Sequence, residues 1–178
     1  NEETAYKIGA ALADKITINR KAVVAMDGRL SGPHIKKALI DGLVSHGIEV
    51  TDCGMLPTPM LYFATKILNI PNGFMVTGSH NPKDYNGIKM IVGDNPLFDK
   101  DIYALRDWIA NNIIDEVINN DKPTISNDIP VKYIKRIKED ISINLEEKFV
   151  IDCMNGITGS VIEKVTRAFN INAEFINS

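Results

Sequence analysis

A short uninterrupted run of apolar residues, Ala22–Met26, constrains the fold of this 178-residue chain more than any other feature. Such a run is typical of a strand covered on both faces, because neither side of that strand meets water. Around it, strand patterns alternate with stretches that repeat apolar residues at helical spacing. This alternation predicts an α/β fold with a mixed, mainly parallel sheet sandwiched by helices.

The expected helices have recognisable start and stop signals. A polar residue followed by a proline in the first turn opens two of them, at Ser31 and at Thr58. Gly47 is a natural C-terminal stop for the first of these two. We expect helices over 4–18, 31–46, 58–68, 99–113, 131–141 and 159–169, and strands over 22–26, 49–53, 73–77, 88–92, 149–152 and 173–176.

The periodic patterns lapse between Asn119 and Asp128, and we interpret this polar stretch as a linker. It divides the chain into a first α/β domain, residues 1–120, and the beginning of a similar second domain, residues 121–178. The order strand, Asp, Gly-containing loop, helix and strand occurs over Val23–Cys53 and again over Phe149–Ile176. This indicates a weak internal repeat.

Composition excludes several classes of partner. With 20 Lys and Arg against 23 Asp and Glu the net charge is −3, and no basic run appears, so nucleic-acid binding has no support. No apolar stretch approaches the length of a membrane span, and an acidic opening is the reverse of a signal peptide. Cys53 and Cys153 lie far apart without further Cys or paired His nearby, which argues against a disulfide framework or a zinc site. We therefore expect a soluble cytoplasmic protein.

The segment from Thr77 to Gly87 concentrates the chemistry of the chain. It places a serine, a histidine, amides, a lysine and a carboxylate after an apolar strand, where open parallel sheets bind ligands. With Lys83 and Lys89 against Asp84 it is net positive, which suits a phosphate. A polar surface loop whose side chains cap turns is the plain alternative.

A Ser-His-Asp hydrolase is a second alternative reading of this segment. It has less support, because Thr77 stands where a nucleophile elbow needs glycine. His80 is also only a sequence neighbour of Ser79, which is not evidence that the two side chains pair.

Several motifs resemble one family. Thr77-Gly78-Ser79-His80-Asn81-Pro82 and the following Asp84–Lys89 resemble the phosphoserine loop of the α-D-phosphohexomutases, and most of all the bacterial phosphomannomutase/phosphoglucomutase branch. Similar matches to that family occur at Asp27–Pro33, Gly54–Pro59 and Val150–Gly156. The chain begins without Met and ends two residues after its last strand pattern. We therefore expect an N-terminal fragment that lacks the first strand of domain 1 and the rest of domain 2.

The resemblance implies roles for individual residues. Ser79 would be the phosphoryl carrier, Lys89 would neutralise its charge or shuttle the hydroxyl proton, and His80 would be a general acid or base or would hold the loop. The remaining phosphate-loop candidates are Thr77, Gly78, Asn81 and Arg29. Among these we expect Asn81 to be structural, and Arg29 either to reach the cleft or to form an ion pair.

The resemblance also implies an activity. It is an isomerase, a phosphomannomutase/phosphoglucomutase that interconverts hexose 1-phosphates and hexose 6-phosphates of the mannose or glucose series through a phosphoserine and a hexose 1,6-bisphosphate. Mg²⁺ would be bound through the phosphate on Ser79, with its other ligands outside this chain, in the remaining domains of the full-length protein. The alternative is a noncatalytic α/β module that binds sugar phosphates.

Overall fold

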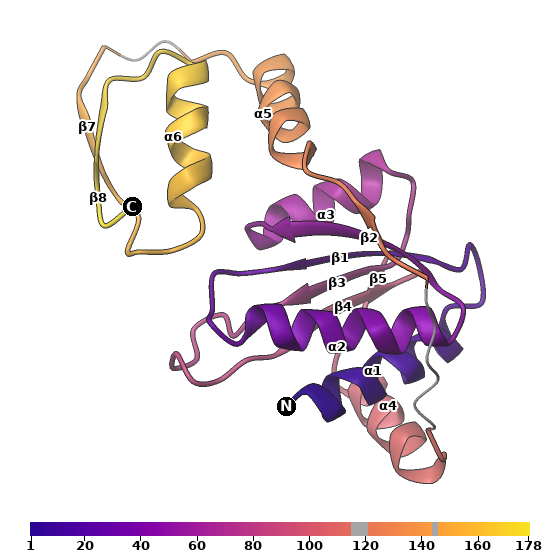
Figure 1. Cartoon of the computed structure of the whole chain (residues 1–178). Coiled ribbons are helices and arrows are strands. Elements are labelled where there is room, and N and C mark those ends of the chain that lie inside the picture. Colours follow the sequence, from indigo (N-terminus) through magenta and orange to yellow (C-terminus); the bar gives the residue numbers. More distant parts are fainter. Residues whose placement is uncertain (115–120, 144–145) are drawn as a thin grey trace.

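The computed structural model describes residues 1–114, 121–143 and 146–178 and contains two α/β units (Figure 1). The first unit is built on a six-stranded sheet in the order β5-β4-β3-β1-β2-β6, and the second contains a two-stranded parallel sheet, β7-β8. Strands β3, β1, β2 and β6 are parallel neighbours, whereas β4 pairs antiparallel with β3 and with β5. This confirms the predicted mixed α/β fold.

Helices and strands alternate along most of the chain. The helices are α1 (Glu2–Lys15), α2 (Gly32–Ser45), α3 (Thr58–Ile67), α4 (Lys100–Asn111), α5 (Ile129–Asp140) and α6 (Gly159–Ala168). The strands are β1 (Lys21–Met26), β2 (Glu49–Met55), β3 (Gly73–Val76), β4 (Ile88–Val92), β5 (Asn95–Pro96), β6 (Thr124–Ile125), β7 (Phe149–Asp152) and β8 (Ala173–Ile176). No helix in the described part of the chain is long and apolar enough to cross a membrane.

Strand β1 is apolar from Ala22 to Met26 because its two faces pack into two different cores. Ala22, Val24 and Met26 pack into the core on the side of α1, α2 and α4. Val23 and Ala25 pack into the opposite core, with α3 and parts of α5 and α6. Alternate residues of a strand point to opposite faces, so a strand covered on both sides needs apolar residues at every position.

Helices α1 and α2 lie so close together that two glycines form their contact. A Cβ at Gly42 of α2 would collide with the carbonyl oxygen of Tyr6 in α1, and a Cβ at Gly9 would collide with the carbonyl oxygen of Leu39. The two helix backbones therefore touch directly, which holds α1 and α2 as one layer over the sheet (Figure 1).

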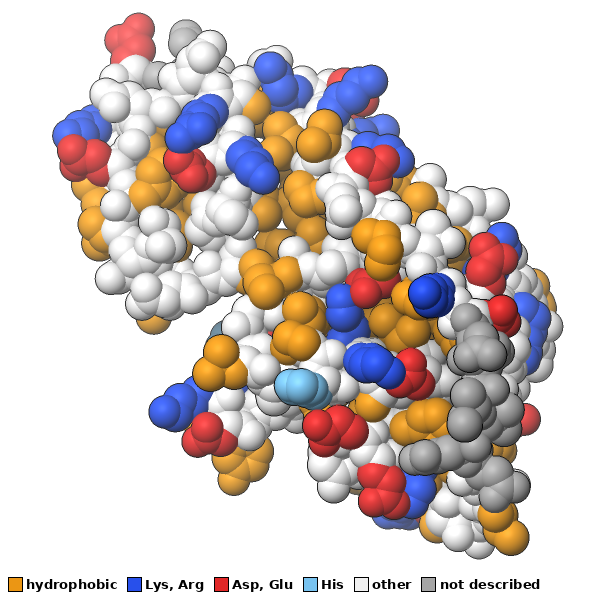
Figure 2. Space-filling view, in the orientation of Figure 1, with side chains coloured by type: hydrophobic (Ala, Val, Ile, Leu, Met, Phe, Trp, Pro, Cys, Tyr) orange, Lys and Arg blue, Asp and Glu red, His pale blue; other side chains and the backbone are white. Residues whose placement is uncertain are grey.

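The second unit packs against the first through α5 and α6. Ile129 and Val161 join the core formed by α3 and β1. The ring of Tyr133 lies edge-on to Phe63 of α3, with the ring centroids 5.2 Å apart. These contacts join the two units beside a hollow that lies between them, on the left of Figure 2.

The structure differs from the expected element bounds at several places. Part of the polar stretch interpreted as a linker forms β6, because Thr51 and Asp52 of β2 pair with Thr124 and Ile125. Residues 119–120 of that stretch lie outside the described residues. Helix α1 ends at Lys15 rather than at residue 18, and α5 begins at Ile129 rather than at residue 131. The boundary between the two domains stays a prediction.

Candidate active site

A cleft of about 960 Å³ opens where strands of both units end. Its lining comes from the loops after β1, β2, β3 and β7, so four loops separated in sequence meet at the carboxyl edge of the sheets, where ligands bind in open α/β proteins. Helices α2, α3 and α6 begin beside this cleft, since Ser31, Thr58 and Thr158 line it. Their positive dipole ends favour an anion there.

Ser79 lies at the centre of the loop after β3 in a left-handed backbone conformation, with φ +51°. Its side chain is exposed and lines the cleft. The backbone N–H of Ser79 donates to Oγ1 of Thr77 at 3.0 Å, and the Thr77 hydroxyl donates to Oδ2 of Asp27 at 2.8 Å. Non-glycine residues adopt this conformation at an energetic cost, so the surrounding contacts must hold it.

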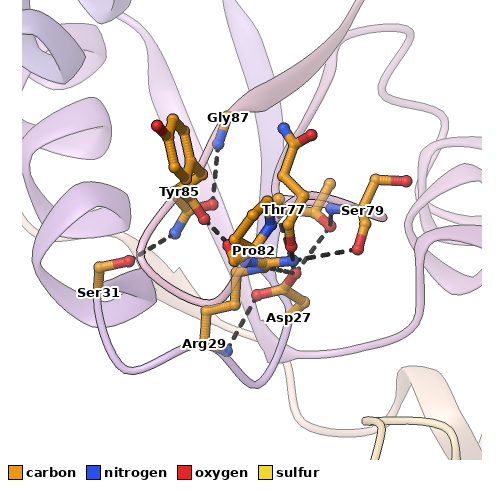
Figure 3. Close-up of polar contacts among 11 residues, drawn as sticks. Asp27, Arg29, Ser31, Thr77, Ser79, Pro82, Tyr85 and Gly87 are labelled. Atoms are coloured by element: carbon orange, nitrogen blue, oxygen red, sulfur yellow. Dashed lines mark hydrogen bonds and ion pairs between the residues drawn. The ribbon is translucent and has the colours of Figure 1, made fainter.

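Arg29 lies under the loop and donates to its backbone. Nη1 donates to the carbonyl oxygens of Pro82 and Tyr85 at 2.6 and 2.9 Å. Nη2 donates to those of Ser79 and Asn81 at 3.1 and 2.7 Å. Nε lies 3.4 Å from Asp27 Oδ2. Figure 3 shows the guanidinium and Asp27 on one side of the loop, with the hydroxyl of Ser79 pointing away from both.

The far end of the loop is attached to the start of α2. Asn86 donates through Nδ2 to Oγ of Ser31 at 3.0 Å, and its own Oδ1 accepts the N–H of Gly87. The N–H of Thr77 donates to the carbonyl oxygen of Gly87 at 2.9 Å, which closes the loop at its base. The segment Asp27–Ser31 therefore contacts the loop at both ends and in the middle (Figure 3).

Lys89 is on β4, next to Met75 of β3 in the antiparallel pair. Directly paired residues share a face of the sheet, and Met75 lines the cleft. Lys89 is therefore on the cleft side of the sheet, exposed, although it is not among the lining residues. Lys83 lies nearer, in the lining itself.

His80 and Asn81 occupy the exposed tip of the loop. Asn81 lines the cleft, and its backbone N–H donates to the carbonyl oxygen of Gly78 at 2.9 Å. His80 is exposed and has no hydrogen-bond partner within the described part of the chain. Its imidazole is thus not holding the loop in this conformation. Whether it acts as an acid or a base stays a prediction.

The loop after β7 forms the opposite wall of the cleft through Met154–Thr158. Met154 and Asn155 are both left-handed, with φ +50° and +54°. The carboxylate of Asp152 accepts the N–H of Met154 at 2.9 Å and the side-chain amide of Asn177 at 3.1 Å. These two hydrogen bonds, that of Met154 first, lower the pKa of Asp152 below its usual value.

The sequence places Ser79, Thr77, Gly78 and Asn81 on one loop and predicts that Arg29 either reaches the cleft or forms an ion pair. The structure places Arg29 both against this loop and beside Asp27. The catalytic and phosphate-binding roles of these residues stay predictions. Asp27 was not predicted as a site residue. The available signal was an acidic residue at the carboxyl end of a buried strand, but nothing in the sequence shows that its carboxylate faces a loop fifty residues away.

The fold and the site define a mixed α/β protein that presents a serine-bearing loop at the carboxyl edge of its sheet. A family model described as phosphoglucomutase/phosphomannomutase, alpha/beta/alpha domain I, matches residues 1–115. The chain belongs to this phosphoglucomutase/phosphomannomutase family.

Individual relatives agree with this assignment. The chain is 42% identical over 168 residues to a phosphomannomutase/phosphoglucomutase of Pseudomonas aeruginosa strain PAO1, covering 93% of this chain and 36% of that protein. It is 37% identical over 166 residues to a phosphoglucomutase of Neisseria meningitidis serogroup B, covering 92% and 36%. The chain thus spans 36% of the length of these curated relatives.

A solved structure shares the fold. A phosphoglucomutase/phosphomannomutase family protein from Burkholderia thailandensis superimposes with a TM-score of 0.87 at 31% identity. The match covers 99% of this chain and 40% of that one. Both units of the present chain, and not only the first, therefore lie within the shared fold.

Proposed function

We propose that the protein carrying this chain is a phosphohexomutase that interconverts hexose 1-phosphates and hexose 6-phosphates of the mannose or glucose series. The observation that carries the proposal is Ser79, which is exposed at the cleft and which the first unit holds in a left-handed backbone conformation. The relatives named phosphomannomutase/phosphoglucomutase support the same activity.

In the proposed reaction Ser79 carries the phosphoryl group. The bond between phosphorus and Ser79 Oγ breaks as a hydroxyl of the bound hexose phosphate forms a new bond to phosphorus. The proton of that hydroxyl passes to a base, and the serine alkoxide takes up a proton. A hexose 1,6-bisphosphate results, and it returns the phosphoryl group from its other end to Ser79. Each step needs in-line positioning and charge neutralisation more than any further covalent chemistry.

The charge around Ser79 suits this chemistry. A phosphoserine carries about −1.5 to −2 charges near neutral pH. Lys83 lines the cleft, Lys89 is on the same side of the sheet, and three helices begin at the cleft. We assign charge neutralisation or proton transfer to Lys89, and proton transfer to His80, whose imidazole is exposed beside Ser79.

Mg²⁺ is part of the proposal, with an oxygen of the phosphate on Ser79 as one ligand. Within residues 1–114, 121–143 and 146–178, no three His, Cys, Asp or Glu side chains gather closely enough to hold a metal ion. Mg²⁺ prefers near-octahedral oxygen ligation. The residues present do not fit a complete magnesium site. Its other ligands are expected in parts of the protein beyond this chain.

We also place the protein in the reducing cytoplasm. Cys53 and Cys153 are both free thiols. Intracellular proteins keep such thiols reduced. The partners we propose are a sugar phosphate and the remaining domains of the full-length protein.

Replacement of the serine tests the activity. In the complete protein, Ser79→Ala is expected to lower turnover by about three orders of magnitude or more, because the phosphoryl acceptor is lost. The replacement should not change the fold, since the Ser79 side chain is exposed. Lys89→Ala should also lower turnover without lowering thermal stability. Turnover of Ser79→Ala at the wild-type level would contradict the proposal.

Intact mass and substrate choice complete the test. Wild-type protein should carry the mass of one phosphate group that Ser79→Ala lacks. A noncatalytic sugar-phosphate-binding module would bind the sugar but carry no covalent phosphate. Coupled assays with mannose 1-phosphate, glucose 1-phosphate and glucosamine 1-phosphate give the substrate series, and a strong preference for the amino sugar would refute the mannose or glucose assignment.

A further inference from the structure

We propose that Asp27 and Arg29 are positioning residues that fix the backbone of Ser79 from behind the loop and thereby set the rate of phosphoryl transfer without binding the substrate. This inference rests on the proposed function. It concerns two residues that also line the cleft, but whose side chains lie across the loop from the Ser79 hydroxyl (Figure 3).

Arg29 has no donor left for a ligand. A guanidinium has five N–H groups in a fixed fork. Four of them are given to the carbonyl oxygens of residues 79, 81, 82 and 85, and Nε faces Asp27. Binding a substrate phosphate would require Arg29 to release loop carbonyls. The geometry therefore makes Arg29 a component of the loop rather than a group that holds the sugar phosphate.

The same pair secures both sides of the Ser79 residue. On its carbonyl side, Ser79 is bound by Arg29 Nη2. On its amide side, Ser79 donates to Thr77 Oγ1, and Thr77 donates to Asp27 Oδ2. Asp27 and Arg29 are themselves joined by the contact between Oδ2 and Nε. These contacts form a closed ring around Ser79, whose left-handed backbone would relax without them.

The pair is largely shielded from water. The side chains of Asp27 and Arg29 are 16% and 15% exposed. A Cβ at Gly78 would collide with Cζ of Arg29, so the guanidinium packs directly against the loop backbone. Because the contacts are short and partly buried, a small displacement of the guanidinium moves Ser79 with it.

Conservative replacements cannot reproduce these contacts. Lysine keeps the positive charge of Arg29 but has three donors on one nitrogen and no planar fork. Asparagine keeps the shape of Asp27, yet both carboxylate oxygens face donors. Oδ1 accepts the N–H of Arg29 at 3.0 Å, and Oδ2 accepts from Thr77 and Gly78. Either orientation of the amide places an NH₂ group against a donor.

Kinetics of the complete protein test the proposal. Arg29→Lys and Asp27→Asn are each expected to lower kcat about 100-fold, because a misplacement near 1 Å costs that much. The KM for the hexose phosphate should stay within about twofold, because neither side chain binds it. Arg106→Lys is the matched control, since Arg106 forms an exposed ion pair with Asp107 on α4, and it should leave both constants unchanged.

Amide hydrogen exchange supplies a readout that does not depend on activity. Peptides covering residues 77–87 should exchange faster in Arg29→Lys and Asp27→Asn than in wild type, because the hydrogen bonds that hold the loop are lost. Peptides from β1 and α1 should exchange as in wild type. In the control variant all these peptides should match wild type.

Several results would overturn the proposal. A raised KM with unchanged kcat would make Arg29 a substrate ligand. Unchanged kcat at a lowered Tm would make the pair merely structural, and unchanged exchange of residues 77–87 would show that it does not hold the loop. If Arg29→Lys fails to fold, the kinetic constants and the hydrogen exchange of the isosteric variant Asp27→Asn test the proposal instead. Failure of the proposed function is distinct, because it would appear as absent turnover in the wild-type protein itself.

Discussion

The two strand–helix–strand units β1-α2-β2 and β7-α6-β8 share one local design and differ in what surrounds it. An aspartate stands at the carboxyl end of the first strand in each unit, Asp27 directly after β1 and Asp152 as the last residue of β7. Its Oδ1 accepts the backbone N–H two residues on, from Arg29 in the first unit and Met154 in the second. In each, the two strands pair in parallel. The weak repeat in the sequence therefore corresponds to similar local structure in both units.

Asp27 and Asp152 differ in the groups that contact their carboxylates. Asp27 uses its second oxygen for Thr77 and Gly78 of the serine loop and contacts the side chain of Arg29. Asp152 binds one further group, the side chain of Asn177, and is exposed. The same turn thus contacts the serine loop only in the first unit, where β3 brings that loop against it.

The first strands of the two units, β1 and β7, also differ in how far they are buried. Every residue of β1 after Lys21 is buried, whereas β7 alternates between half-buried and exposed residues. β1 lies between β2 and β3 with helices on both faces, while the described residues place only β8 beside β7. Burial in this protein follows from the number of neighbouring layers, and stability should follow burial.

The largest expected difference between the two units concerns their glycines. Gly42→Ala in α2 should lower the free energy of unfolding by about 3 kcal/mol, because the added Cβ meets the backbone of Tyr6 and forces α1 away from α2. Gly159→Ala in α6 should stay within about 0.5 kcal/mol, since its Cβ would meet only looser contacts at 3.3 Å or more. Urea unfolding of the chain measures both. Equal losses would show that the two helices are packed alike.

A smaller difference is expected for one valine in each first strand. Val24 in β1 is fully buried and Val150 in β7 is 64% exposed. Val24→Ala should cost about 2 kcal/mol from lost apolar burial and the cavity left behind. Val150→Ala should cost about 0.5 kcal/mol or less. The shift in urea midpoint at constant m-value gives the comparison, and a loss at Val150 as large as that at Val24 would mean that β7 is covered in solution.

The part of the fold that could be predicted is the part whose residues face apolar neighbours. The run Ala22–Met26 predicted β1 because both of its faces are buried. The two-residue strands β5 and β6 were not predicted, since they are exposed and carry no apolar pattern. Their pairing depends on backbone hydrogen bonds, which every residue can accept and every residue except proline can donate, so no side-chain pattern marks these strands.

The candidate site likewise contains residues that the sequence could predict and contacts that it could not. Ser79 was predicted because its neighbours in sequence form a motif. The contacts of Arg29 could not be predicted, because the guanidinium binds backbone carbonyls fifty or more residues away, and a carbonyl oxygen has no side-chain signature. Sequence patterns reveal side chains that lie on the same helix or strand. The hydrogen bonds from Arg29 to the serine loop depend instead on how two loops far apart in the sequence meet.

The smallest expected effect compares the two cysteines. Cys53 on β2 is 3% exposed, and Cys153, just after β7, is half-buried. Burial raises the pKa of the Cys53 thiol to about 12, and the carboxylates of Asp52 and Asp128 add to the shift. In the folded chain a thiol reagent near neutral pH should modify Cys153 and spare Cys53, because the attacking species is the exposed thiolate. Equal rates for the two thiols would show that β2 opens readily.

The same thiol makes stability depend on pH in a defined window. Between about pH 9 and the folded pKa of about 12, the unfolded state loses the Cys53 proton while the folded state keeps it. The folded state then binds more protons, so the free energy of unfolding falls as pH rises. The loss is about 1 kcal/mol at about pH 9.5 for a single thiol. Cys53→Ala should remove this part of the slope, whereas Cys153→Ala should leave the slope unchanged. Lysine side chains also lose protons in this pH range, so the slope of one variant alone does not isolate the effect of Cys53. The difference in slope between Cys53→Ala and Cys153→Ala measures how strongly burial disfavours the Cys53 thiolate.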